Sequence, residues 1–458
     1  MAKDVFDTSS AIEVLDALNE VLVNSSRFNW KLYEAFTEAY SVYLSILFKD
    51  GNTSKDFAEF EKIIRKKIGN IFNTKFRDDN FIVTLSDVVA SYSNLAKATG
   101  FGKIYQHLSN PWSVWDNGFT EPLRDTLWRT PSYKVTNLEK YSLFRYYYDK
   151  TREGDKDKDK DTDDDRIHPT TPLLIVYAFI NRHYILDLLP EVSVVRNLLR
   201  QGFDIFATDW GTPSAFDKGL TIGHFVNSYM DRSVDLIREI TKSDKVSLLG
   251  YCWGGNLVLT YAALHPEKVK NVITIATPGD SSLDDTLLSV WTKGMEVDTL
   301  LNAFGNVPST LLNEAFALRN PVEYSYKYPH FFEQPHGLES IMEFLATETW
   351  LYDSPPIIGE IYREFVKYCY QQNLFIRNKM MVDGVLVNLK DINMPFLNVV
   401  AQRDDLVASR SSIALNNAVG SVDKSAIEFQ SGHVGLIIGQ RAHQEVWPKV
   451  GDWLRERS

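Results

Sequence analysis

The chain has 458 residues, 44% of them hydrophobic and 13% aromatic, which is enough for one large core and a second region. A formal net charge of −11 argues against general nucleic-acid binding. The only two cysteines, Cys252 and Cys369, imply no disulfide framework and fit a reducing compartment. The N-terminus MAKDVFDTSS lacks a signal-peptide pattern, and the longest apolar run, near 173–180, is far shorter than a membrane span. We therefore expect a cytoplasmic protein.

Residues 1–130 are predicted to form an N-terminal helical region. Aromatic and apolar residues recur there at spacings of three and four, as in the run from Tyr33 to Leu47 and again from Phe57 to Ile71. No catalytic motif accompanies this pattern. The region is either a small helical bundle or a docking surface for a partner subunit or an apolar product, and the pattern does not choose between them.

The remaining residues, 131–458, are predicted to form one catalytic domain. Residues 142–147 have the composition of an edge strand, and the charged tract GDKDKDKDTDDD at 154–165 is predicted to be a solvated loop. From residue 171 onward, short apolar runs alternate with helical stretches, which is typical of buried parallel strands in a doubly wound α/β sheet. These runs are 172–180, 203–208, 245–249, 270–277, 396–400 and 425–430.

One connection in this pattern is too long for a simple crossover. More than a hundred residues, rich in Trp, Tyr, Phe and Pro, separate Thr277 from Pro395. We interpret residues of about 280–390 as a mostly helical cap inserted between two strands. Long insertions of this kind commonly cover an active site.

The stretch LLGYCWGGN, residues 249–257, predicts a nucleophile elbow. An apolar strand, a Gly-x-nucleophile-x-Gly turn and a helix follow one another, and Cys252 occupies the nucleophile position. Gly250, Gly254 and Gly255 allow the tight turn and the close approach of the helix to the sheet. An unpaired Cys is more often a small apolar residue than a nucleophile, so the thiol needs partners.

Candidate partners follow two later strands. The loop at 401–407 carries Asp404 and Asp405, and the loop SGHVG carries His433. Nucleophile, acid and histidine stand in the chain order of a hydrolase-type triad, each at the carboxyl end of a predicted strand. An oxyanion hole would use the backbone N–H of Trp253 and another from the loop near 180–182.

Other candidates have weaker patterns. Cys369 lies on a predicted cap helix and is interpreted as a packing residue. Asp209 follows a strand and either shapes a turn or serves the site as a second carboxylate. The histidines His183, His224 and His265 lack metal-ligand spacing with Cys or acidic residues, so no metal site is predicted.

Together these residues resemble class III polyhydroxyalkanoate synthases, from about residue 133 to the end of the chain. The resemblance rests on PLLIVYAFINRHYILDL (172–188), GFDIFATDWGTPS (202–214), VSLLGYCWGGN (246–256), ETWLYDSPPIIGE (348–360), RDDLV (403–407) and SGHVGL (431–436). It implies an α/β-hydrolase fold with Cys252 as nucleophile, His433 as base, Asp404 as the acid, and Ile180 and Trp253 as oxyanion donors. The family usually has His and Pro where Asp405 and Ala408 stand.

The resemblance also implies a function. Members polymerise (R)-3-hydroxyacyl-CoA into polyester through an acyl-cysteine, with CoA as product and without a cofactor. We therefore expect a cytoplasmic enzyme at polyhydroxyalkanoate granules, working as a homodimer with a helical second subunit of the PhaE type. A thioesterase or a polyester depolymerase with the same triad is an alternative. A granule-associated scaffold without activity is another.

Overall fold

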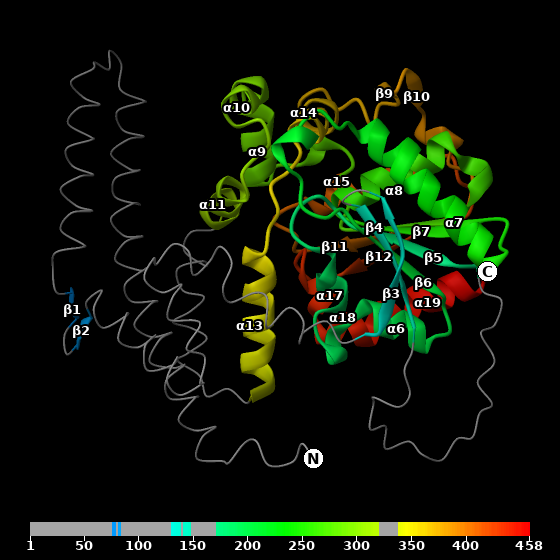
Figure 1. The fold of residues 1–458 in the computed structure, drawn as a ribbon, viewed down its shortest axis with the longest axis horizontal. Helices are drawn as coiled ribbons and strands as arrows, with labels where there is room; N and C mark the ends of the chain where they lie inside the picture. The colour runs from blue at the N-terminus through cyan, green and yellow to red at the C-terminus, as the bar shows by residue number, and fades with distance from the viewer. Residues whose placement is uncertain (1–75, 79–80, 84–129, 139–140, 148–170, 320–337) are drawn as a thin grey trace. The chain divides into compact units, whose positions relative to one another are not determined.

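The computed structural model describes residues 76–78, 81–83, 130–138, 141–147, 171–319 and 338–458 (Figure 1). The chain divides into two compact units, one comprising residues 1–121 and 320–342 and the other residues 122–319 and 343–458. The second unit contains every candidate site residue named above. In the first, the described residues include a short antiparallel pair, β1 (Phe76–Asp78) and β2 (Phe81–Val83), in a stretch predicted to be helical. Most of the predicted N-terminal helical region, and the tract at 154–165, lie outside the described residues.

An eight-stranded sheet forms the centre of the second unit, in the order β12-β11-β8-β7-β5-β6-β4-β3. The six predicted parallel strands are confirmed as β5 (Leu173–Val176), β6 (Ile205–Asp209), β7 (Val246–Tyr251), β8 (Val269–Ile275), β11 (Phe396–Ala401) and β12 (Lys424–Phe429). The prediction of 172–180 was too long, because β5 ends at Val176 and the chain continues as a loop. The α/β class is therefore confirmed.

The prediction of an edge strand at 142–147 was wrong in its position. Strand β4 (Tyr141–Tyr146) pairs antiparallel with β6 on one side and with β3 (Ser132–Leu138) on the other. The outer strand is therefore β3. Its sequence, SYKVTNL, lacks the apolar run by which the inner strands were recognised.

Helices cover both faces of the sheet (Figure 1). On one face lie α6 (Val194–Arg200) and α19 (Trp447–Arg455), and on the other α7 (Asp231–Thr241) and α8 (Trp253–Leu264). All residues of α8 except the last are buried, which explains its almost uniformly apolar sequence. Four shorter helices follow β11 and β12: α15 (Ser409–Ile413), α16 (Leu415–Ala418), α17 (Gly435–Ile438) and α18 (Gln440–Glu445).

The described part of the segment between β8 and β11 is mostly helical. Its described helices are α9 (Leu287–Gly294), α10 (Val297–Phe304), α11 (Ser309–Arg319), α13 (Leu338–Tyr352), α14 (Gly359–Glu364) and the π-helix η8 (Phe365–Gln371). A hairpin of β9 (Met380–Val382) and β10 (Val385–Val387) ends it and was not predicted. Across the part of the chain that the structure describes, no helix combines the length and the apolar character needed to cross a membrane.

Candidate active site

Cys252 lies at the turn between β7 and α8, as the sequence predicted. Its backbone has φ 55° and ψ −127°, an uncommon conformation for a residue with a side chain. Two backbone hydrogen bonds hold it: the Cys252 N–H donates to Ile275 O at 2.9 Å, and the Gly255 N–H donates to Cys252 O at 2.9 Å. Strain of this kind costs of order 1–3 kcal/mol and persists only where the surroundings enforce it.

The three elbow glycines are required by close packing. A side chain at Gly250 would meet the backbone of Gly254 in the first turn of α8. At Gly254 it would meet the carbonyl oxygen of Val176 at the end of β5, and at Gly255 the side chain of Thr277. The glycines therefore let α8 begin directly against the ends of the neighbouring strands.

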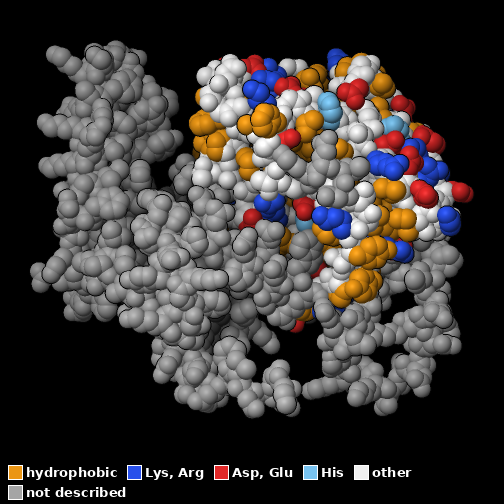
Figure 2. Space-filling view, viewed as in Figure 1, with side chains coloured by type: hydrophobic (Ala, Val, Ile, Leu, Met, Phe, Trp, Pro, Cys, Tyr) orange, Lys and Arg blue, Asp and Glu red, His pale blue; other side chains and the backbone are white. Residues whose placement is uncertain are grey.

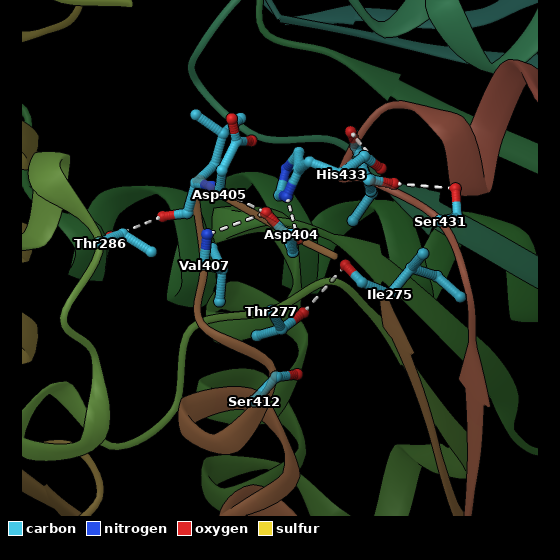
Figure 3. Close-up of polar contacts among 12 residues, drawn as sticks. Ile275, Thr277, Thr286, Asp404, Asp405, Val407, Ser412, Ser431 and His433 are labelled. Carbon is cyan, nitrogen blue, oxygen red and sulfur yellow. Dashed lines mark hydrogen bonds and ion pairs between the residues drawn. The ribbon is translucent and has the colours of Figure 1, made fainter. Parts of the chain in front are cut away.

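Asp404 connects the loop after β11 to His433, which follows β12. Its Oδ2 atom accepts a hydrogen bond from Nδ1 of His433 at 2.7 Å. Its Oδ1 atom accepts from the backbone N–H groups of Leu406 and Val407, each at 2.9 Å. Figure 3 shows the carboxylate between the ring and the Val407 nitrogen. The Asp404 side chain is only 1% exposed, so this geometry is fixed and shielded from water.

The electrostatics of this cluster favour a protonated His433. Burial is the largest influence and opposes the charged ring, but the charges of Asp404 and Cys252 and hydrogen bonds with both side chains outweigh it. Together they raise the pKa of His433 from 6.5 to about 10. Because Nδ1 is bonded to Asp404, we infer that Nε2 faces the thiol.

The neighbouring carboxylate, Asp405, is directed elsewhere. Its side chain is 51% exposed and forms an ion pair with Arg319 at the end of α11. Figure 3 shows it pointing away from the His433 ring. Of the two aspartates that the sequence offered, only Asp404 contacts the histidine.

One predicted oxyanion donor begins the helix after Cys252, and the other lies in the loop after β5. Trp253 is the first residue of α8, where backbone N–H groups have no partner within the helix. Ile180 lies in the loop after β5, and the close contact between Gly254 and Val176 O brings the end of that strand against α8. The turn therefore places Trp253 next to Cys252, and the roles of Trp253 and Ile180 in binding an oxyanion stay predictions.

The side chain of Trp253 fastens the elbow to the cap. Its ring stacks on Phe365 with centroids 4.3 Å apart and planes 9° apart, and its Nε1 atom donates to Tyr370 Oη at 3.1 Å. Sequence reasoning missed both partners.

The weaker candidates have other surroundings. Cys369 is buried in η8, and burial raises the pKa of its thiol to about 12, which agrees with a packing residue. Asp209 accepts a hydrogen bond from the Gly211 N–H at 2.9 Å and so shapes its turn. Its Oδ1 atom also lies 3.6 Å from Nδ1 of His183. Within the described residues, no group of three or more His, Cys, Asp or Glu could hold a metal ion.

Known proteins resemble this chain in sequence. A family model described as alpha/beta hydrolase fold matches residues 171–439. The chain is 40% identical over 287 residues to the poly(3-hydroxyalkanoate) polymerase subunit PhaC of Allochromatium vinosum, covering 62% of this chain and 81% of the relative. It is 38% identical to the PhaC subunit of Thiocystis violacea, covering 63% of this chain and 81% of the relative. With that of Haloferax mediterranei it shares 43% identity, covering 63% of this chain and 59% of the relative.

Proposed function

The chain belongs to the α/β-hydrolase superfamily and, within it, to the family of the poly(3-hydroxyalkanoate) polymerase subunit PhaC, and we propose that it polymerises 3-hydroxyacyl-CoA thioesters into polyester with release of CoA. One structural observation carries the proposal beyond family membership: Cys252 lies at a strained elbow, and a hydrogen bond to Asp404 orients the buried His433, whose pKa the charges of Asp404 and Cys252 raise. We assign nucleophile, base and orienting acid to these three residues. No cofactor is needed, because the thioester supplies the energy for transfer.

In the acylation step, His433 takes the proton of the Cys252 thiol and the sulfur attacks the thioester carbonyl. The backbone N–H groups of Ile180 and Trp253 stabilise the oxyanion of the tetrahedral intermediate. The carbon–sulfur bond to CoA then breaks. CoA thiolate accepts the proton from His433 and leaves, so one thioester replaces another and the charges balance.

In the elongation step, the 3-hydroxyl group of a second unit attacks the acyl-cysteine carbonyl. His433 accepts the hydroxyl proton while Asp404 stabilises the resulting imidazolium. The bond between the acyl carbon and the Cys252 sulfur breaks, the thiolate recovers the proton, and one ester bond has formed. Each cycle lengthens the polyester by one unit and frees one CoA.

A thiol suits this reaction better than a serine hydroxyl. Transfer of an acyl group from the sulfur of CoA to the sulfur of Cys252 is nearly balanced in free energy, so the acyl-enzyme stays reactive. A serine ester would lie lower and slow the next transfer. A Cys paired with a protonated His also ionises readily, which favours attack.

Water must be kept from the acyl-cysteine, since hydrolysis would end the cycle. The buried Trp253 and Phe365 and the partly buried Tyr370 support this role, because their rings place apolar surface beside the elbow. We propose that the part of the cap around η8 limits the access of water to the acyl-cysteine and moves to admit substrate.

The test is CoA release from 3-hydroxybutyryl-CoA by the purified chain, with products separated by size. We expect a high-mass polyester from the wild type and none from Cys252→Ala. Free 3-hydroxybutyrate as the main product would identify a thioesterase instead. Release of 3-hydroxybutyrate from added polyester alone would identify a depolymerase, and no turnover in any assay would indicate a scaffold.

The remaining partners are also proposals. We propose a homodimer at the surface of a polyester granule, assisted by a helical second subunit. Exposed apolar side chains on the cap helices, among them Val290 of α9 and Phe304 of α10, support binding of this face to an apolar surface. Figure 2 shows hydrophobic side chains interspersed with charged ones on one face of the molecule. Light scattering with and without a candidate second subunit tests the assembly.

A further inference from the structure

The loop that carries Ile180 has an irregular backbone. It follows β5 directly, and its next residue, Asn181, has φ 62°, a left-handed conformation. The 3-10 helix η2 (His183–Asp187) continues the chain. A loop of this kind has no ladder of sheet hydrogen bonds, so its shape depends on side chains and on neighbouring segments.

A short segment of the cap supplies those neighbours. Trp350, on the last turn of α13, donates from Nε1 to the backbone oxygen of Arg182 at 2.8 Å. Ser354 Oγ donates to Asn181 Oδ1, and Asp353 Oδ2 accepts from Tyr184 Oη at 3.1 Å. We call Trp350, Asp353 and Ser354 the clasp.

Arg182 connects the clasp to the sheet. Its Nε atom pairs with Asp353 Oδ1 at 3.3 Å, while Nη1 donates to Gly211 O at 3.0 Å and Nη2 to Thr212 Oγ1 at 2.9 Å. One guanidinium thus joins the cap, the loop after β5 and the turn after β6. The Arg182 and Asp353 side chains are 17% and 13% exposed, so water screens the pair only weakly.

Three of the four residues that follow Ile180 are therefore hydrogen-bonded to the clasp. Trp350 is 5% exposed, and its indole N–H meets a backbone carbonyl, which fixes the peptide chain and not merely a side chain. A displacement of the clasp would move the Ile180 N–H relative to Cys252. Because an oxyanion donor acts only within about 3 Å of its target, a small shift removes its effect.

We propose that Trp350 and Asp353 are positioning residues that hold the Ile180 N–H in place, so that the oxyanion hole is complete only while the cap is closed. The inference rests on the proposed function for the identity of the oxyanion donors. Opening the cap to admit substrate would dismantle the hole at the same moment. Water that enters while the cap is open then meets an acyl-cysteine without oxyanion stabilisation. Hydrolysis is therefore suppressed even when the cap does not exclude water.

The test compares two reactions of Cys252 that make different demands. Acylation by S-phenyl thiobutyrate needs the oxyanion hole, whereas alkylation by iodoacetamide needs only the thiolate. In Asp353→Asn and Trp350→Phe, we expect acylation, followed by thiophenol release, to slow at least tenfold through kcat with KM within about threefold, as for loss of part of one donor. Alkylation should stay within about twofold of the wild-type rate.

Asp298→Asn is the matched control. It removes a carboxylate that pairs with Arg363 and Lys367 elsewhere on the cap, so both rates should be unchanged. Tyr184→Phe removes the hydroxyl that donates to Asp353 and should give a smaller loss, which provides a second comparison if a clasp variant folds poorly. Wild-type acylation rates in both clasp variants, or equal losses in acylation and alkylation, would overturn the proposal. A wild type that is acylated by the thioester but makes no polymer would refute the polymerase assignment and leave this comparison intact.

Discussion

The Nδ1 atom of His433 lies 2.7 Å from Oδ2 of Asp404, while Asp405, the next residue, pairs with Arg319 on the far side of the loop. We therefore expect Asp404→Asn to lower turnover by at least a hundredfold, because it removes the charge that stabilises the imidazolium. Asp405→Asn should change turnover less than threefold. The measurement is kcat for CoA release, and the reverse ranking would reassign the acid.

Replacing the nucleophile tests the argument for a thiol. Cys252→Ser should keep the fold, since the hydroxyl is smaller than the thiol and the same elbow can hold it. It should lose more than nine tenths of the polymerisation rate, because serine is a weaker nucleophile here and its ester is less reactive. Retention of a tenth or more, which is a barrier change of ~1.4 kcal/mol or less, would contradict the thiol argument.

The raised pKa of His433 predicts how stability varies with pH. The folded pKa is about 10, against 6.5 for the free side chain. Between these values the folded chain keeps a proton that the unfolded chain has lost, so the free energy of unfolding should fall as pH rises through this window. The stabilisation is fully present below about pH 6.5.

Urea unfolding at several pH values between 6.5 and 10 measures this slope. Asp404→Asn removes the main charge that favours the imidazolium, and we expect a clearly shallower slope in this variant. Asp405→Asn serves as the control and should follow the wild type. Equal slopes in wild type and Asp404→Asn would show that the ion pair does not set the protonation of His433.

The close packing of the elbow predicts that a single methyl group added at Gly254 destabilises the fold. Gly254→Ala would press a side chain against the carbonyl oxygen of Val176 and should destabilise the fold by about 2 kcal/mol, with loss of activity. Gly294→Ala, at the end of α9 where nothing lies within 4 Å of an added side chain, should be neutral or slightly stabilising. The free energy of unfolding of each variant is measured by chemical denaturation. Equal values for the two variants would contradict the packing argument.

Much of the sheet could be predicted, since buried parallel strands have continuous apolar sequences and the triad follows a fixed chain order. The choice between Asp404 and Asp405 could not be made from the residues alone, because adjacent side chains in a loop can point in opposite directions. The outer strand β3 was missed because an edge strand needs no apolar run.

The contacts between the cap and the elbow also could not be predicted from the sequence. Phe365 and Tyr370 are five residues apart, a spacing that an α-helical period does not place on one side. They reach the same Trp253 because η8 is a π-helix, whose turns are wider. The contact of Trp350 with Arg182 joins segments 168 residues apart in the chain, and no local pattern reports such a pairing.

The position of β12 at one margin of the sheet has a consequence for biosynthesis. His433 follows this strand, so during translation Cys252 leaves the ribosome before Asp404 and His433, the residues proposed to activate it. If these roles hold, a nascent chain that has folded only its first strands lacks the base for this thiol. Under this proposed mechanism, acyl transfer can begin only after β11 and β12 have added to the sheet.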